Sequence, residues 1–218
     1  AAAAALLLCE LHETEPSDAL LTGIERTCRF LIDELLPAQR WQDFEVFYSC
    51  AAKPLDWFDH RTGQHAQNTL NIYWAAETLL RAVAFCGNDE YLQAGRHCLD
   101  HLSLHQQVWN ATFLQLYTFG GFAAMNGDGE WNDMRQPMFS QAYFRAYLQT
   151  HLAEDVQRGR AALRSGYALY SHPDHADLNP VHHDTYPPGY MAENYAHSGD
   201  EAHNHRSGFD WGGGSLAT

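Results

Sequence analysis

The segment GFAAMNGDGEWNDMRQP, residues 121–137, places three carboxylates beside a tryptophan and an arginine. The acids are Asp128, Glu130 and Asp133. Hydrolysis of a glycosidic bond needs one protonated and one ionised carboxyl group on opposite sides of that bond. Crowding of acids raises the pKa of one of them, which can supply the general acid. This acid loop is therefore the first candidate for glycosidase chemistry.

The catalytic partner of the acid loop is expected in another loop, because neighbours in one loop seldom face each other across a sugar ring. Glu193 in GYMAENYAH and Asp210 in SGFDWGGG are the leading candidates. Asp43 and Glu45 in WQDFE come next. For each acid taken singly, the alternative is a helix cap or a loop hydrogen bond.

Aromatic residues make up 13% of the chain, and several fall in predicted loops where core packing does not explain them. Sugar rings present C–H faces that stack on aromatic rings, so these residues suggest a glycan-binding platform. The predicted substrate-binding residues are Trp41, Trp57, Trp131, Arg135, Tyr190, Tyr195 and Trp211.

Histidine is concentrated near the end of the chain, with seven residues between His172 and His205. A polysaccharide lyase uses His or Tyr to remove a proton next to a uronate carboxylate, and Asn or Arg steadies the developing charge. His197 is thus a further catalytic candidate, and this alternative also involves His183, Tyr186, Tyr190, Tyr195, Asn194 and Arg206. No HExxH motif is present, so we predict no zinc site.

Calcium is the only cofactor that the acid loop suggests. Asn126, Asp128, Glu130 and Asn132 have the alternating spacing of a calcium loop, but Trp131 stands where an EF-hand requires glycine. We therefore predict no cofactor, with an irregular calcium site as the alternative.

Composition restricts the partners. The net charge is −14, which repels phosphate backbones and argues against a nucleic-acid partner, although screening over ~10 Å lets a local basic patch override that field. The apolar start AAAAALLLC is too short to span a membrane. A secreted or periplasmic location would need a signal removed from, or lying outside, this sequence.

The five cysteines include no CxxC motif and are expected as buried thiols, with a Cys86–Cys98 disulfide as the alternative.

The chain contains an internal repeat. DEYLQAGRHCL (89–99) aligns with AEDVQRGRAAL (153–163) at an offset of 64 residues, as for Glu90 and Glu154. Apolar residues of helical period predict two helices in each repeat, in hairpin units 68–104 and 132–170. Asn88 is the predicted cap of the second helix. Gly95 and Gly159 predict a close approach between helices.

The connections within the predicted hairpins are short and those between them are long, so all long loops emerge at one end of the array. This predicts an all-α fold, an (α/α) toroid of hairpins with long loops at one rim, including a C-terminal rim loop over residues 171–214. A closed ring of six hairpins would need roughly twice this length, so we expect an incomplete ring, and residues 1–218 as one toroid domain or a fragment of one.

The stretches WQDFEVFYSCAAKPLDWFDHRTGQHAQNTL, LHQQVW, FGGFAAMNGDGEWNDMRQ and SGFDWGGGS resemble uncharacterised bacterial proteins of the six-hairpin glycosidase-like type. The resemblance is specific in these loops and weak in the helices. It implies an (α/α) toroid that acts on carbohydrate. Hydrolases belong to that superfamily, and similar toroids carry polysaccharide lyases and epimerases.

The sequence thus predicts a carbohydrate-active enzyme, with a glycoside hydrolase as the first hypothesis. A polysaccharide lyase is the second, and a non-catalytic helical-repeat module that binds a glycan or a protein is the third. The chain has no P-loop, GxGxxG or GxSxG motif, so nucleotide cofactors and serine-hydrolase chemistry have no support.

Overall fold

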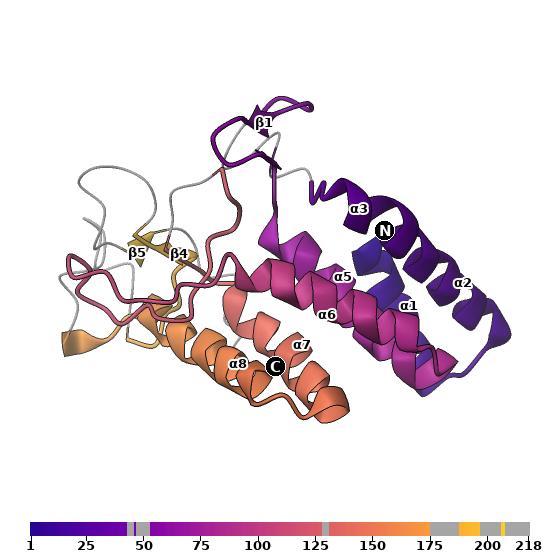
Figure 1. The fold of residues 1–218 in the computed structure, drawn as a ribbon. Coiled ribbons are helices and arrows are strands. Elements are labelled where there is room, and N and C mark those ends of the chain that lie inside the picture. Colours follow the sequence, from indigo (N-terminus) through magenta and orange to yellow (C-terminus); the bar gives the residue numbers. More distant parts are fainter. Residues whose placement is uncertain (43–45, 47–52, 128–130, 175–187, 197–205, 208–218) are drawn as a thin grey trace. The chain divides into compact units, whose positions relative to one another are not determined.

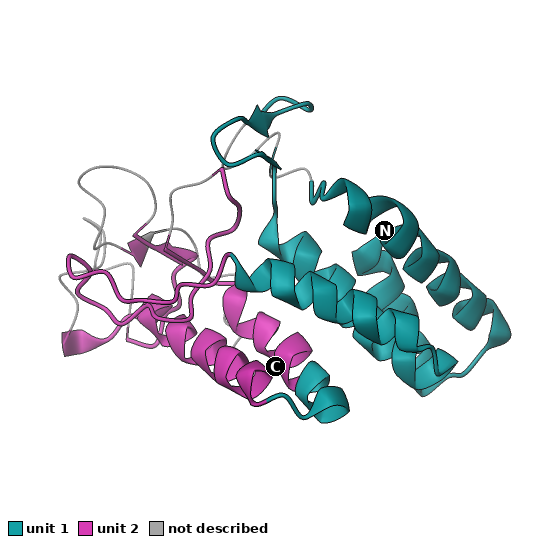
Figure 2. Ribbon diagram, in the orientation of Figure 1, with its two compact units in different colours: residues 1–104, 145–152 teal, residues 105–144, 153–218 magenta. Residues whose placement is uncertain are grey.

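The computed structural model describes residues 1–42, 46, 53–127, 131–174, 188–196 and 206–207 (Figure 1). The protein is mostly helical, which confirms the predicted helical class. The chain forms two compact units (Figure 2). Unit 1 comprises residues 1–104 and 145–152, and unit 2 comprises residues 105–144 and 153–218.

Unit 1 begins with the helices α1 (Ala2–Thr14) and α2 (Asp18–Phe30). A π-helical turn, η1 (Leu31–Leu35), continues α2 into α3 (Leu36–Ala38), where Gln39 adopts φ 48° and ends the helix. A two-stranded antiparallel sheet follows, formed by β1 (Phe58–Asp59) and β2 (Gln64–His65).

The two helices predicted within residues 68–104 are confirmed as α5 (Thr69–Cys86) and α6 (Asp89–Ser103), which lie side by side (Figure 1). Gly87, at φ 59°, closes α5, and the Asn88 side chain accepts a hydrogen bond from the Glu90 amide at 2.9 Å. A Cβ atom on Gly95 would stand 2.9 Å from Leu80 Cγ, so the predicted close approach of the two helices is also confirmed.

The core of unit 1 contains a charged group as well as apolar side chains. The predicted stripes are buried at Ile72, Ala76, Leu79 and Leu80 of α5 and at Tyr91, Cys98, Leu99 and Leu102 of α6. Glu77 is fully buried, and its Oε1 accepts from the Nε atoms of Arg81 and Arg145, each at 2.8 Å. The two guanidinium groups compensate the burial of this carboxylate.

Unit 2 contains residues 136–144 of helix α7 (Gln136–Thr150) and all of α8 (Ala153–Ser165). A Cβ atom on Gly159 would stand 2.7 Å from the Phe144 ring, which confirms the second predicted close approach. The prediction that the last helix runs to residue 170 is wrong. The chain leaves α8 at Ser165 and tightens into a 3-10 helix, η2 (Gly166–Leu169), which buries Ala168 and Leu169 and exposes Tyr167.

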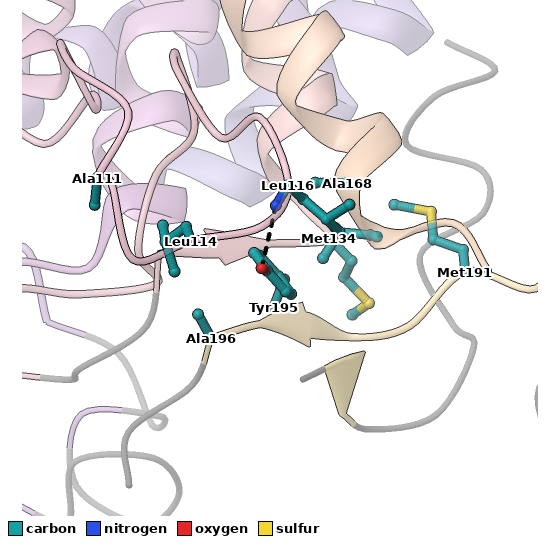
Figure 3. Packing of buried hydrophobic residues seen from close by; sticks show 9 residues of the cluster. Ala111, Leu114, Leu116, Met134, Ala168, Met191, Tyr195 and Ala196 are labelled. Carbon is teal, nitrogen blue, oxygen red and sulfur yellow. Dashed lines mark hydrogen bonds between the residues drawn. The ribbon is translucent and has the colours of Figure 1, made fainter. Parts of the chain in front are cut away.

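A three-stranded antiparallel sheet in unit 2 joins segments that are distant in sequence. Its strands are β3 (Asn132–Asp133), β4 (Asn194–Tyr195) and β5 (Arg206–Ser207), in the order β3-β4-β5. The sequence did not predict this sheet, because two-residue strands are too short to show an alternating pattern. An apolar cluster that includes Leu114, Met134, Met191 and Tyr195 packs beside it (Figure 3).

Two further predictions concern cysteines and membranes. Cys9, Cys28, Cys86 and Cys98 are free thiols, so the alternative Cys86–Cys98 disulfide is not formed, and Cys50 lies outside the described residues. Over the described ranges, no helix combines the length and the apolar character needed to cross a bilayer.

Candidate functional site

Gly120 and Gly121, at the start of the acid loop, occupy positions where no side chain fits. Gly120 adopts φ +92°, and a Cβ atom there would collide with the main chain of Ala161 in α8. A Cβ atom on Gly121 would collide with the side-chain amide of Asn132. These contacts require glycine and fix the start of the acid loop against α8.

Two glutamine side chains hold the same loop by its main chain. Gln106 is buried, and its Nε2 donates to the carbonyl oxygens of Gly120 and Arg158, both at 3.0 Å. The side-chain amide of Gln136 accepts a hydrogen bond from the Phe122 main-chain N–H and donates one to the Phe122 carbonyl oxygen. A side-chain amide can donate and accept hydrogen bonds at the same time, so Gln136 binds both main-chain polar groups of Phe122. Sequence reasoning missed both glutamines, although LHQQVW and FGGF stood out as motifs.

The far end of the acid loop pairs with the segment that carries Glu193. The Met134 amide donates to the Glu193 carbonyl at 2.8 Å, and Asp133 lies opposite Asn194 in the β3–β4 register. The Ala192 amide in turn donates to the Leu169 carbonyl at 2.9 Å. Main-chain hydrogen bonds therefore connect segments around residues 133, 170 and 193 within unit 2.

Asp133 is tied to Arg135 and is not a free carboxylate. Its Oδ1 lies 2.6 Å from Arg135 Nε, and its Oδ2 lies 2.7 Å from Arg135 Nη2. Oδ1 also accepts from the Arg135 amide at 2.9 Å. Asp133 is buried and the Arg135 side chain is nearly so. This bidentate pair engages both groups in the local structure of the acid loop, and their catalytic and substrate-binding roles stay predictions.

Glu193 is the other predicted acid within the described residues. Its side chain is partly exposed, and its main chain is held by the hydrogen bond from Met134. The remaining predicted catalytic residues lie outside the described part of the chain, as do Trp211 and several weaker candidates. These catalytic residues are Asp128, Glu130, His197 and Asp210, and the weaker candidates are Asp43, Glu45, His183 and Tyr186.

Two predicted substrate-binding aromatics belong to the core. Trp41 is only 1% exposed, and its ring meets that of His101 edge-on at 6.2 Å. Tyr195 is fully buried, and its hydroxyl accepts a hydrogen bond from the Leu116 amide at 3.4 Å (Figure 3). The expectation that core packing does not explain the Trp41 ring is wrong, because irregular segments of unit 1 also contribute to the core. Trp57 and Tyr190 are partly exposed.

Trp131 is part of an exposed aromatic cluster. The rings of Trp109 and Phe113 meet it edge-on, with centroid distances of 5.7 and 5.6 Å. Trp109 is 53% exposed and Phe113 50% exposed. Sequence reasoning missed both, although their loop, between residues 104 and 120, is long and aromatic. Such a surface is suited to stacking against flat apolar faces of a ligand.

A cleft of about 870 Å³ opens elsewhere on unit 2. Three tyrosines, Tyr117, Tyr167 and Tyr170, contribute to its lining, together with Arg164, His172 and Arg206. Arg206 lies in β5, opposite Tyr195 in the register, and its Nε donates to the Ala168 carbonyl at 2.9 Å. The cleft and the acid loop are therefore connected through one sheet. Its volume is in the range of small-molecule sites.

No known protein family matches this sequence, and no curated protein matches it significantly. The six-hairpin resemblance and the toroid remain predictions.

Metal ligands are not assembled within the part of the chain that the structure describes. There, no group of three or more His, Cys, Asp or Glu side chains is arranged to hold a metal ion. Asn132, one of the four oxygen donors in the alternative calcium loop, is buried and donates through Nδ2 to the Ser165 carbonyl at 2.9 Å. This residue therefore supports the fold of the loop and does not face a surface site.

Proposed function

We propose that this protein is a glycoside hydrolase whose site lies in unit 2. The observation that carries the proposal is the hydrogen bond between Met134 and Glu193, because it joins the end of the acid loop to the segment of the second candidate acid. Glu193 is partly exposed, whereas Asp133 is buried and paired with Arg135. The proposed acid–base pair is therefore Glu193 with Asp128 or Glu130, which precede β3 in the sequence.

The aromatic cluster supports a carbohydrate ligand. Trp131 directly follows Glu130 in the sequence and packs against the exposed rings of Trp109 and Phe113. Sugar rings stacked on these side chains would lie beside the acid loop. The net charge of −14 disfavours nucleic acid as the competing partner.

A non-catalytic glycan-binding module is the second candidate. It is favoured by the aromatic cluster of Trp109, Phe113 and Trp131, in which Trp109 and Phe113 are about half exposed. The lyase hypothesis has weaker support, because the hydroxyl of Tyr195 is buried and engaged with the Leu116 amide. A general base must reach the substrate proton.

The test is to incubate the protein with a panel of glycans and to measure new reducing ends and ultraviolet absorbance together. Reducing ends without absorbance support hydrolysis, and both signals together indicate elimination. Binding without either signal indicates the module. Trp109→Ala should weaken glycan binding while the matched variant Phe58→Ala, an exposed ring of unit 1, should not. No binding and no product with any glycan would reject the proposal.

A further inference from the structure

A second cleft of unit 2 adjoins the cleft described above. The first cleft, of about 870 Å³, has Tyr117 in its lining, and the second, of about 420 Å³, has Phe119 in its lining. The rings of Tyr117 and Phe119 lie with centroids 6.1 Å apart and planes tilted by 33°. The two clefts therefore meet at this aromatic pair.

The aromatic pair belongs to a segment in which burial alternates. Leu116 and Thr118 are buried, whereas Tyr117 is exposed and Phe119 partly exposed. Asn110 anchors the buried side of the segment, because its Oδ1 accepts hydrogen bonds from the Thr118 amide at 2.7 Å and from Thr118 Oγ1 at 3.1 Å. The segment thus holds both rings on its outer side.

Helix α8 contributes to the lining of both clefts. Gln157 and Ala161 line the second cleft, and Arg164 lines the first. These residues are spaced at i, i+4 and i+7, which places them on one face of the helix. The 3-10 helix η2 adds Tyr167, which is 66% exposed, to the first cleft. The two clefts are therefore parts of one elongated groove along α8.

The described lining of this groove is nearly balanced in charge. In the second cleft, Arg158 Nη2 lies 2.7 Å from Glu154 Oε1. In the first cleft, Arg164 is balanced by Asp174, and Arg206, which is 1% exposed, is engaged within the fold. A charged ligand would find no surplus of opposite charge here, so the groove suits a neutral one.

The groove combines aromatic faces with hydrogen-bonding groups. The rings of Tyr167 and Tyr170 lie with centroids 6.1 Å apart and planes tilted by 35°, and the side-chain amides of Gln107 and Gln157 belong to the second cleft. A sugar residue has C–H faces that stack on such rings and hydroxyl groups that bond to phenols and amides. Each cleft alone has the volume of a small-molecule site, so a ligand that fills both is a chain.

We propose that this groove binds a neutral, linear oligosaccharide that spans both clefts. The proposal rests on the proposed carbohydrate function and narrows its ligand from glycans in general to uncharged chains of several sugar residues. Once one part of such a chain is bound, the linked part reaches the neighbouring cleft at a high effective concentration. A long oligosaccharide should therefore bind more tightly than a short one.

The test is calorimetric titration of the full chain with oligosaccharides of cellulose, xylan, mannan and amylose, each from the disaccharide to the hexasaccharide. In at least one series, the hexasaccharide should bind about tenfold more tightly than the disaccharide. Tyr167→Ala in the first cleft and Gln157→Ala in the second should each weaken hexasaccharide binding by about fivefold. The disaccharide, which fills a single cleft, should respond to at most one of these variants.

Two controls match the groove variants. Arg160→Ala alters an exposed residue of the same helix as Gln157 that lines neither cleft, and Phe58→Ala removes an exposed ring of unit 1 in place of Tyr167. Both should bind the hexasaccharide as the unmodified protein does.

Equal affinity for disaccharide and hexasaccharide in every series would overturn the inference. So would a hexasaccharide affinity that either groove variant leaves unchanged, or binding confined to acidic glycans. If glycan binding then still depended on Trp109, the proposed function would stand without the inference. Absence of binding by every glycan would overturn both.

Discussion

The Met134 amide donates a 2.8 Å hydrogen bond to the carbonyl oxygen of Glu193. This bond uses main-chain atoms only, so it fixes the position of Glu193 without engaging its carboxylate. A substitution of the Glu193 side chain therefore leaves this hydrogen bond in place. At Asp133 the carboxylate itself makes the structural contacts, through its two hydrogen bonds with the Arg135 guanidinium.

Asp133→Asn should lower the free energy of unfolding by about 3 kcal/mol, because it leaves the nearly buried guanidinium of Arg135 without its counter-charge. The matched control is Asp59→Asn. Asp59 likewise accepts from the amide two residues on, that of Arg61, but the Arg61 side chain is almost fully exposed. Denaturant unfolding should show a much smaller loss for Asp59→Asn. Equal losses for the two variants would contradict the structural role of Asp133.

Gly120→Ala should destabilise the protein by about 3 kcal/mol, since it adds strain at positive φ to a collision with Ala161. Gly189→Ala is the comparison, because Gly189 has φ +84° with open space around it. That variant should cost about 1 kcal/mol from the backbone alone. Thermal unfolding of both variants measures the difference, and similar costs would argue against the tight packing of Gly120 on α8.

Stability should fall as the pH rises from about 9 to about 12. Burial raises the pKa of Cys9 and of Cys28 from 9.0 to about 12. Above pH 9 the unfolded chain loses these protons while the folded chain retains them, so ionisation favours unfolding in that window. Urea titrations at several pH values should show this decline, and it should be shallower in Cys28→Ser. An unchanged slope in that variant would contradict the burial of this thiol.

Sequence patterns predicted the helical hairpins well, because caps, apolar period and glycine contacts are local features. Asn88 caps a helix, and Gly95 and Gly159 allow a neighbouring side chain to approach closely, and each of these roles could be predicted from the residue type and its position. The repeat also helped to predict the helices, because corresponding helices in the two repeats place apolar residues and glycine at matching positions.

The candidate site was less predictable, because non-local pairs build it. Nothing in the order of residues indicates that Met134 pairs with Glu193 or that Gln106 holds Gly120. Tyr195 was assigned to substrate for its aromatic ring, yet it packs in a core formed by loops and short strands. The residue type shows which interactions a side chain can make, while its burial in the fold determines whether a ligand can reach it.

The central claim is that Glu193 performs acid–base chemistry on a glycan, and the most direct measurement is turnover per folded molecule of Glu193→Gln. On a glycan that the unmodified protein cleaves, we expect turnover to fall by at least about a hundredfold, while binding and melting temperature stay nearly unchanged. Glu15→Gln, which removes one exposed acid from unit 1, should retain full turnover. Full turnover in Glu193→Gln, or a lower melting temperature with activity per folded molecule intact, would contradict the claim.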